Sequence, residues 1–190
     1  MRIKDEHKQK AIIEATVKLV NEIGFVSSSV SKIAKEAGVS PATIYIYYKN
    51  KEDLLVSTYV NIKKELGGAL LEGFDDSIPI RDILEKIWHN MFNYISNHTH
   101  YFNFTEQFAN SPYSEMVDRD EVEQSFQPVM QILHTGVEQK ILKDVSFEML
   151  ATFIFYPILT LSNSRLCKNI KLNNETIEDA FRMAWDAIKL

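Results

Sequence analysis

The sequence predicts an all-α protein of about nine helices, with an N-terminal domain over residues 6–66 and a C-terminal helical domain over residues 67–190. Apolar residues recur at a spacing of three and four along most of the chain, which is the pattern of helices buried on one face. Glycine, proline and N-capping side chains separate these stretches, as is typical of helix ends. The chain contains no internal repeat, low-complexity tract or long linker. We therefore expect two compact helical domains.

Composition and the N-terminal residues indicate a soluble, cytoplasmic protein. Hydrophobic residues make up 45% of the 190 residues, and no apolar run reaches the length of about 18 residues that spans a bilayer. The charged N-terminus has no apolar segment behind it, so we predict no membrane partner. The single cysteine, Cys167, excludes an internal disulfide framework. We expect a buried or idle thiol there, the alternatives being an intermolecular disulfide or a redox switch.

The net charge of −5 is unevenly distributed along the chain. Residues 1–66 carry a net charge of +3, and residues 67–190 carry −8. A basic N-terminal domain suits contact with the phosphates of a nucleic acid. The bias is modest, so it supports such a function without establishing it.

Residues 29–48 predict two short helices joined by a tight turn. One face of the first helix is apolar at positions i, i+3, i+4 and i+7, which are Val30, Ile33, Ala34 and Ala37. Gly38 can adopt a positive φ and turn the chain sharply. Ser40 then stands at an N-cap position and Pro41 at the first position of the second helix. Such a helix-turn-helix places its second helix in the major groove of DNA.

The second helix of this motif is expected to present hydroxyl groups to DNA. Ile44 and Tyr48, four residues apart, supply the face that packs on the first helix, so their tyrosine neighbours must point elsewhere. The predicted DNA-facing hydroxyls belong to Ser40, Thr43, Tyr45 and Tyr47. This helix has no Arg, Asn or Gln, so base reading would depend on short polar contacts, methyl groups and DNA shape.

Flanking helices complete the N-terminal domain. A helix from Lys8 to about Ile23 precedes the motif and supplies the core that two short helices lack. A further helix begins after Asn50, which with Asp53 has the pattern of a capping box. We expect this helix to be weakened at Gly67–Gly68 and to stop near Gly73.

A resemblance to a known family is carried by the run GFVSSSVSKIAKEAGVSPATIYIYYKNKEDLL. This run is similar to the DNA-binding head of the tetracycline-repressor (TetR) family of bacterial regulators, and it covers roughly the first third of the chain. The resemblance implies a homodimer that binds a double-stranded DNA operator. It also implies that the following residues occupy positions that meet DNA: Ser29, Ser40, Pro41, Ala42, Thr43, Tyr45, Tyr47 and Lys51.

The remainder of the chain is predicted to be helical. The expected helices cover about residues 79–97, 99–109, 115–141, 147–167 and 173–190. Pro128 would kink or divide the third of these helices, and Pro157 lies inside the fourth.

Sixteen of the 21 aromatic residues follow residue 66. Most of them must form a helical core and a dimer interface, but the resemblance also implies an effector pocket, which is typically apolar with a few polar groups. We expect the effector to be small and apolar or aromatic. The predicted pocket residues are His89, Phe92, Phe104, Gln107, Phe108, Phe126, Met130 and His134.

The last two helices are predicted to form the dimer interface. An apolar stripe at helical spacing runs from Ile177 to Ile188, and similar proteins use these helices to dimerise. The alternative is that the stripe closes the core of its own domain. The predicted interface residues are Phe153, Ile177, Phe181, Ala184, Trp185 and Ile188.

Catalysis and metal binding are not predicted. His98 and His100 lack an adjacent third ligand and are expected to lie in a polar turn. The motifs of common hydrolases, metalloproteases and nucleotide-binding loops are absent from the sequence, so we expect no enzyme and no cofactor. We therefore predict a ligand-responsive DNA-binding regulator, most simply a repressor. The alternative interpretations are a ligand-independent DNA-binding or architectural dimer, and an enzyme that carries this DNA-binding domain.

Overall fold

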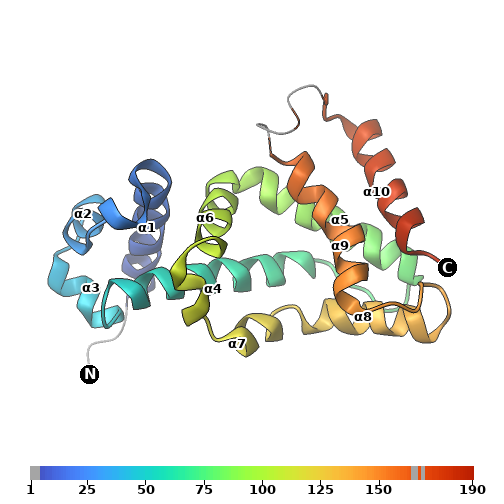
Figure 1. Ribbon diagram of the computed structural model, residues 1–190, viewed down its shortest axis with the longest axis horizontal. Coiled ribbons are helices and arrows are strands. Elements are labelled where there is room, and N and C mark those ends of the chain that lie inside the picture. The colour runs from blue at the N-terminus through green and yellow to red at the C-terminus, as the bar shows by residue number, and fades with distance from the viewer. Residues whose placement is uncertain (1–4, 164–166, 168–169) are drawn as a thin grey trace. The chain divides into compact units, whose positions relative to one another are not determined.

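The computed structural model describes residues 5–163, 167 and 170–190, and over these residues the chain is all-helical (Figure 1). It divides into two compact units. The first comprises Met1–Lys63 and His98–Glu121, and the second comprises Lys64–Asn97 and Val122–Leu190. The chain therefore passes from one unit to the other three times, after residues 63, 97 and 121. The predicted division at residue 66 lies near the first of these crossings, and the other two were not predicted.

The first unit contains the predicted head and two further elements. Its helices are α1 (Glu6–Ser27), α2 (Val30–Glu36), α3 (Pro41–Tyr47), the beginning of α4 (Lys51–Leu70), α6 (Thr99–Ala109) and the 3₁₀ helix η1 (Pro112–Met116). Asp5 caps α1, because its carboxylate accepts the backbone N–H groups of His7 and Lys8. The helix is kinked at Gly24, which has a φ of 75°.

The core of the head is built by the faces that the helical spacing predicts. Its buried residues come from the first four helices, and they are Ile12, Ala15, Ile33, Ala34, Ile44, Tyr48 and Leu54. The small side chain of Ala34 suits the crossing of α2 and α3, which contact each other. The predicted cap of α4 is also present. The Asp53 N–H donates to Asn50 Oδ1 at 2.7 Å, and the Lys49 N–H donates to Asp53 Oδ2 at 2.7 Å.

Helix α6 packs against α1 within the first unit. The ring of Phe108 stacks on Tyr59 with centroids 4.4 Å apart, and it meets Phe25 edge-on at 6.2 Å. Polar contacts extend this junction. Asn21 Nδ2 donates to the carbonyl of His100 at 2.8 Å, and Gln107 Nε2 donates to Asn21 Oδ1 at 2.9 Å. Residues 98–121 are therefore tied to the head by both apolar and polar contacts.

The helices of the second unit pack around α9. Its helices are α5 (Ile80–Asn97), α8 (Gln127–Glu138), α9 (Phe147–Leu161) and α10 (Asn174–Ile188), while α7 (Arg119–Gln124) lies where the chain enters it. Helix α9 contacts α5, α8 and α10. Trp88 of α5 is fully buried and donates its indole N–H to the carbonyl of Ile154 at 2.9 Å. Its ring also meets Phe181 of α10 edge-on.

Several helices differ from their predicted extents. Helix α1 runs to Ser27, across the kink at Gly24, rather than ending near Ile23. The predicted helix over 115–141 is divided into η1, α7 and α8, with Pro128 in the first turn of α8, where a missing N–H costs little. Helix α9 ends at Leu161 rather than near Cys167, and residues 164–166 of its predicted extent lie outside the described residues. Helix α4 continues through Gly67 and Gly68 to Leu70.

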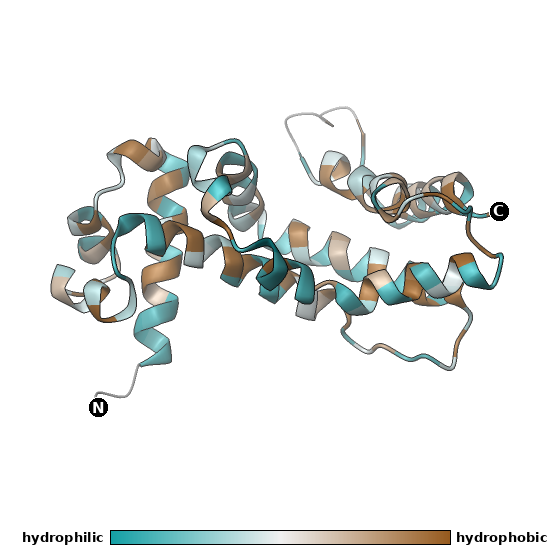
Figure 2. Cartoon of the chain, turned by 60° about the horizontal axis from the view of Figure 1, so that its bottom comes forward, coloured by the Kyte–Doolittle hydropathy of each residue, from teal (hydrophilic) through white to brown (hydrophobic). Residues whose placement is uncertain are grey.

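Hydrophobic and hydrophilic residues alternate around the helices, as expected for elements buried on one face (Figure 2). Every helix among the described residues is too short or too polar to cross a membrane.

Candidate nucleic-acid interface

The turn between α2 and α3 is built as the sequence predicts. Gly38 has a φ of 66°, in the left-handed region that suits glycine. The Val39 N–H donates to the carbonyl of Ala34 at 2.9 Å and closes the end of α2. Ser40 caps α3, because its Oγ accepts the Thr43 N–H at 3.2 Å. Local chemistry therefore fixes where α3 begins.

Helix α3 presents one face to the core and one to solvent. Ile44 is fully buried and Tyr48 nearly so, whereas the side of α3 that carries Tyr45 is open, with Tyr45 56% exposed. Burial raises the pKa of the Tyr48 phenol, which keeps this core hydroxyl neutral. The predicted DNA-facing residues Ser29, Ser40, Pro41, Ala42 and Tyr45 are all exposed, and Thr43 is half-buried.

Tyr47 has a structural contact that its predicted role did not include. Its hydroxyl accepts the backbone N–H of Asp5 at 3.0 Å and donates to the Asp5 carbonyl at 3.2 Å. The side chain is half-buried and fastens the start of α1 to the end of α3. Tyr47 is therefore an anchor of the head, and its contact with DNA stays a prediction.

Lys51 also lies in a defined contact. Its ammonium donates to the carbonyl of Phe25 at 2.5 Å and lies 3.4 Å from that of Val26. These carbonyls belong to the last turn of α1, where a cation is favoured by the helix dipole. The same residue is the first of α4.

The predicted effector residues do not form one group. Phe104 and Phe108 are fully buried in the first unit, and Gln107 in the same unit bonds to Asn21. The other five belong to the second unit: His89, Phe92, Phe126, Met130 and His134. Of these five, Met130 and His134 line a groove of about 720 Å³ between α8 and the start of α9.

The lining of this groove is mainly apolar. Its walls include the apolar Leu133, Val137, Phe147 and Leu150. The polar lining residues are Gln127, Gln131, His134 and Asp144. A volume of this size lies within the range of about 300–1,000 Å³ that is usual for small-molecule sites. His134 is exposed at the rim, where Nδ1 lies 3.5 Å from a carboxylate oxygen of Glu138.

The predicted dimer stripe lies largely in the core of the second unit. Phe181, Ala184, Trp185 and Ile188 are buried within the second unit, where they pack in its core, and their place in a dimer interface stays a prediction. Ile177 is half-buried and Phe153 is 49% exposed. Exposed apolar residues lie elsewhere on the same two helices, and they are Met149, Phe153, Tyr156 and Met183. We call these four residues the α9–α10 apolar face.

Sequence reasoning missed two contributors to the head, Asp5 and Asn21, and the partners of a third, Phe25. The predicted first helix begins at Lys8, whereas Asp5, a favoured N-cap residue, caps a helix that begins at Glu6. The backbone of Asp5 is the partner of Tyr47, and no sequence pattern indicates that contact. Phe25 and Asn21 join α1 to α6 across more than 75 residues of sequence.

Comparisons with known proteins agree with this architecture. Residues 12–58 match the family model described as bacterial regulatory proteins, tetR family, and residues 79–189 match the tetracyclin repressor-like C-terminal domain. A TetR family transcription regulator of known structure from Marinobacter aquaeolei VT8 is 36% identical, with a TM-score of 0.90 over 100% of this chain and 99% of that one.

Two proteins from Bacillus subtilis are also similar. The fatty acid metabolism regulator protein is 46% identical over 71 residues, which are 37% of this chain and 34% of that protein. The match thus spans about a third of that relative. The transcriptional regulator FadR, solved in complex with stearoyl-CoA, shares the fold with a TM-score of 0.74 at 23% identity, over 94% of this chain and 98% of that one.

The all-helical fold and its exposed recognition helix define a helix-turn-helix protein with a DNA-binding domain, that is, a regulator of transcription. The chain belongs to the TetR family, as the matches over both its N-terminal and C-terminal regions establish.

Proposed function

We propose that the protein is a homodimeric repressor that binds a pseudo-palindromic operator and is released from it by a small apolar effector. The observation that carries this proposal is the exposed face of α3, which presents Tyr45 and the capped N-terminus of the helix. In a two-fold dimer, two such helices would enter major grooves about 34–36 Å apart or at a related spacing. The alternative is a DNA-binding dimer that responds to no ligand.

The contacts with DNA are assigned by exposure and chemistry. Short hydroxyl and methyl groups at the N-terminus of α3, from Ser40, Ala42 and Thr43, would approach phosphates and base edges. The ring of Tyr45 projects from the same helix and supplies the largest exposed surface. Lys51 would add a phosphate contact by turning its ammonium from the α1 carbonyls to the DNA backbone.

Replacement of Tyr45 by alanine is expected to weaken specific operator binding about 10–100-fold, which corresponds to the loss of roughly 1–3 kcal/mol of contact energy. The fold should be unaffected because the side chain is exposed. The measurement is a gel shift with the DNA upstream of the protein's own gene, with a scrambled duplex as competitor and thermal unfolding of each variant in parallel.

Two matched variants sharpen this experiment. Met116→Ala removes an equally exposed apolar side chain, 55% exposed, outside the helix-turn-helix and should bind DNA as the wild type does. Tyr47→Phe removes only the hydroxyl that bonds to Asp5 and should lower stability by about 1 kcal/mol. Wild-type operator affinity in the Tyr45→Ala variant would refute the assigned reading face.

The effector is proposed to bind the second unit. The groove between α8 and α9 supports this because its size and apolar walls suit a small apolar molecule, and its polar side chains can orient one. The stearoyl-CoA complex of FadR from Bacillus subtilis supports a fatty-acyl group as the first candidate to test.

Release would follow from a shift between two conformations of the dimer. The two units are joined covalently through α4, through the α5–α6 junction and through α7, so a change in the second unit has three chain connections to the head. An effector releases DNA only if it binds the released conformation better. A hundredfold preference corresponds to about 2.7 kcal/mol.

We expect stearoyl-CoA to raise the operator dissociation constant of the protein, measured by gel shift or fluorescence anisotropy, with coenzyme A as the matched control. Leu150→Trp, which fills the groove at a buried position, should reduce the response without reducing DNA binding in the absence of ligand. An unchanged dissociation constant with stearoyl-CoA and with a panel of other apolar compounds would favour the ligand-independent alternative.

A further inference from the structure

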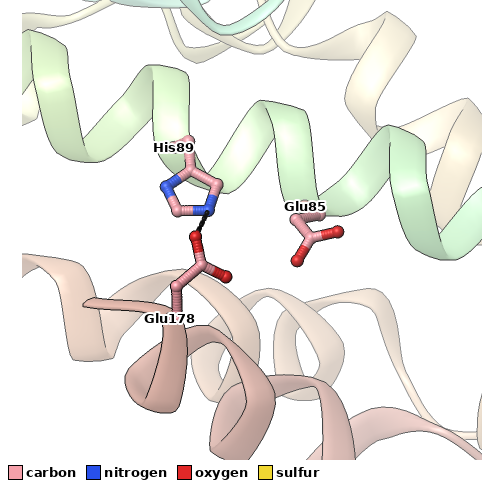
Figure 3. A group of neighbouring side chains, drawn as sticks. All are labelled: Glu85, His89 and Glu178. Carbon is pink, nitrogen blue, oxygen red and sulfur yellow. Dashed lines mark ion pairs between the residues drawn. The ribbon is translucent and has the colours of Figure 1, made fainter. Parts of the chain in front are cut away.

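Three side chains with metal-ligating groups converge between α5 and α10 (Figure 3). Glu85 and His89 are four residues apart on α5 and therefore lie on one face of that helix. Glu178 approaches them from the first half of α10, and its Oε1 lies 3.6 Å from His89 Nε2. One ligand atom from each of the three residues lies within 4.8 Å of the others. All three residues belong to the second unit.

The donor set determines which ion would fit. One imidazole nitrogen with two carboxylates suits first-row transition metals, because imidazole is a poor ligand for Mg²⁺ and Ca²⁺. Zinc bonds of about 2.0–2.2 Å place neighbouring ligand atoms roughly 3–3.5 Å apart, so small side-chain rotations would bring the three groups to one ion. We propose that Glu85, His89 and Glu178 form a binding site for a divalent transition metal, with Zn²⁺ as the first candidate.

Arg81 positions one of these ligands. Its guanidinium donates to Glu85 Oε2 at 2.9 Å and to Oε1 at 3.3 Å, while it lies over the ring of Phe181. A carboxylate has about four acceptor positions, so Glu85 can keep these bonds and still offer an oxygen to a metal. Hydrogen-bonded carboxylates of this kind are usual around metal sites. The positive charge of Arg81 lowers the affinity but also fixes the carboxylate in place.

The cluster is open to solvent, and a metal ion bound there would stabilise the contact between α5 and α10. The side chains of His89 and Glu178 are 30% and 56% exposed, so an ion can enter from solvent and water can complete its coordination. A bound ion would fasten α10 to α5, two helices that already contact each other. Because the ion would bind the folded chain only, it would stabilise the fold by mass action.

The experiment uses the full-length protein after removal of metals with a chelator. Titration with Zn²⁺ in a calorimeter should show one site per chain, and Zn²⁺ should raise the melting temperature. Co²⁺, used as a spectroscopic probe, should give visible absorption bands that Zn²⁺ abolishes. His89→Gln and Glu178→Gln should each weaken Zn²⁺ binding by about 100-fold or more, since loss of even an outer partner typically costs 10–100-fold.

The chain offers a matched control for these variants. His134 and Glu138 form another exposed His–Glu pair at a spacing of four, 3.5 Å apart, on α8. His134→Gln should therefore leave Zn²⁺ affinity and the Co²⁺ spectrum unchanged. The assignment is overturned if Zn²⁺ binds the wild type and the Glu178→Gln variant equally, or if His134→Gln causes the same loss as His89→Gln. Absence of a Co²⁺ spectrum and of a thermal shift in the wild type would also overturn it.

Discussion

Replacement of Phe153 by aspartate is expected to convert the proposed dimer into monomers and to abolish high-affinity operator binding. Phe153 is 49% exposed at the centre of the α9–α10 apolar face, with Met149 and Tyr156 one turn to either side and Met183, 74% exposed, on the adjoining helix. Exposed apolar side chains in this arrangement are typical of a surface that a partner covers. A carboxylate placed there would be desolvated without a counter-charge when two copies meet.

The size of the effect follows from where the charge is placed. A central apolar residue of an interface typically contributes at least ~2 kcal/mol, or about 30-fold in the dimer dissociation constant, and an uncompensated charge adds to that loss. Light scattering after size-exclusion chromatography measures the oligomeric state. Operator binding should fall in parallel, because a single head engages one half-site only.

A control variant separates charge from position. Met116→Asp introduces the same carboxylate at an equally exposed apolar residue of the first unit and should leave the oligomeric state unchanged. A Phe153→Asp protein that remains dimeric at micromolar concentration would place the interface elsewhere. Because Phe181 and Trp185 are buried, their replacement would unfold the second unit rather than test the interface.

Replacement of Phe108 by alanine is expected to lower the free energy of unfolding by about 3–5 kcal/mol. The ring is fully buried, and it contacts Phe25 of α1, Tyr59 of α4 and Phe104 of α6. Its loss would leave a cavity where these three helices meet, and the rigid neighbours cannot close it. Operator binding should weaken as well, because α6 would lose its main apolar contact with the head.

Urea denaturation at one fixed protein concentration measures this effect, since the stability of a dimer depends on concentration. Phe74→Ala is the matched control, because Phe74 lies in the connection between α4 and α5 and is 46% exposed. We expect its unfolding free energy to change by less than about 1 kcal/mol. Equal losses in both variants would show that Phe108 does not hold the junction between α1, α4 and α6.

The head could be predicted in detail because its signals are local. Gly38, Ser40 and Pro41 specify the turn and the start of α3 through backbone conformation and capping, which depend on neighbouring residues only. The same holds for the Asn50 and Asp53 cap of α4. The orientation of α3 followed from its short apolar pattern, and the burial of Ile44 confirms it.

The effector and dimer residues could not be predicted in the same way. A helical stripe such as Ile177–Ile188 shows which face of α10 is buried, but the same hydrophobic spacing serves a core and an interface equally well. Phe181 and Trp185 are buried by packing within the second unit, which the spacing alone could not distinguish from burial by a partner. The groove at Met130 and His134 likewise depends on where α8 lies against α9.

Gly67 is a residue whose local propensity gave a wrong expectation for its helix. Its low helix propensity predicts a weakened α4, yet the helix passes through it without a break. A Cβ at this position would lie 2.5 Å from the carbonyl oxygen of Ser125, so the absence of a side chain allows the two backbones to approach. The reason for this glycine lies almost 60 residues away in the chain.

The sequence by itself determined the all-helical class, the helix-turn-helix and the burial of Ile44 and Tyr48, because capping, turn conformation and amphipathic spacing act over a few residues. Only the tertiary structure decided that α6 belongs with the head, that Tyr47 holds Asp5, and that Glu178 meets His89. These features join segments distant in sequence, and their energies arise from packing and hydrogen bonds that no local pattern encodes.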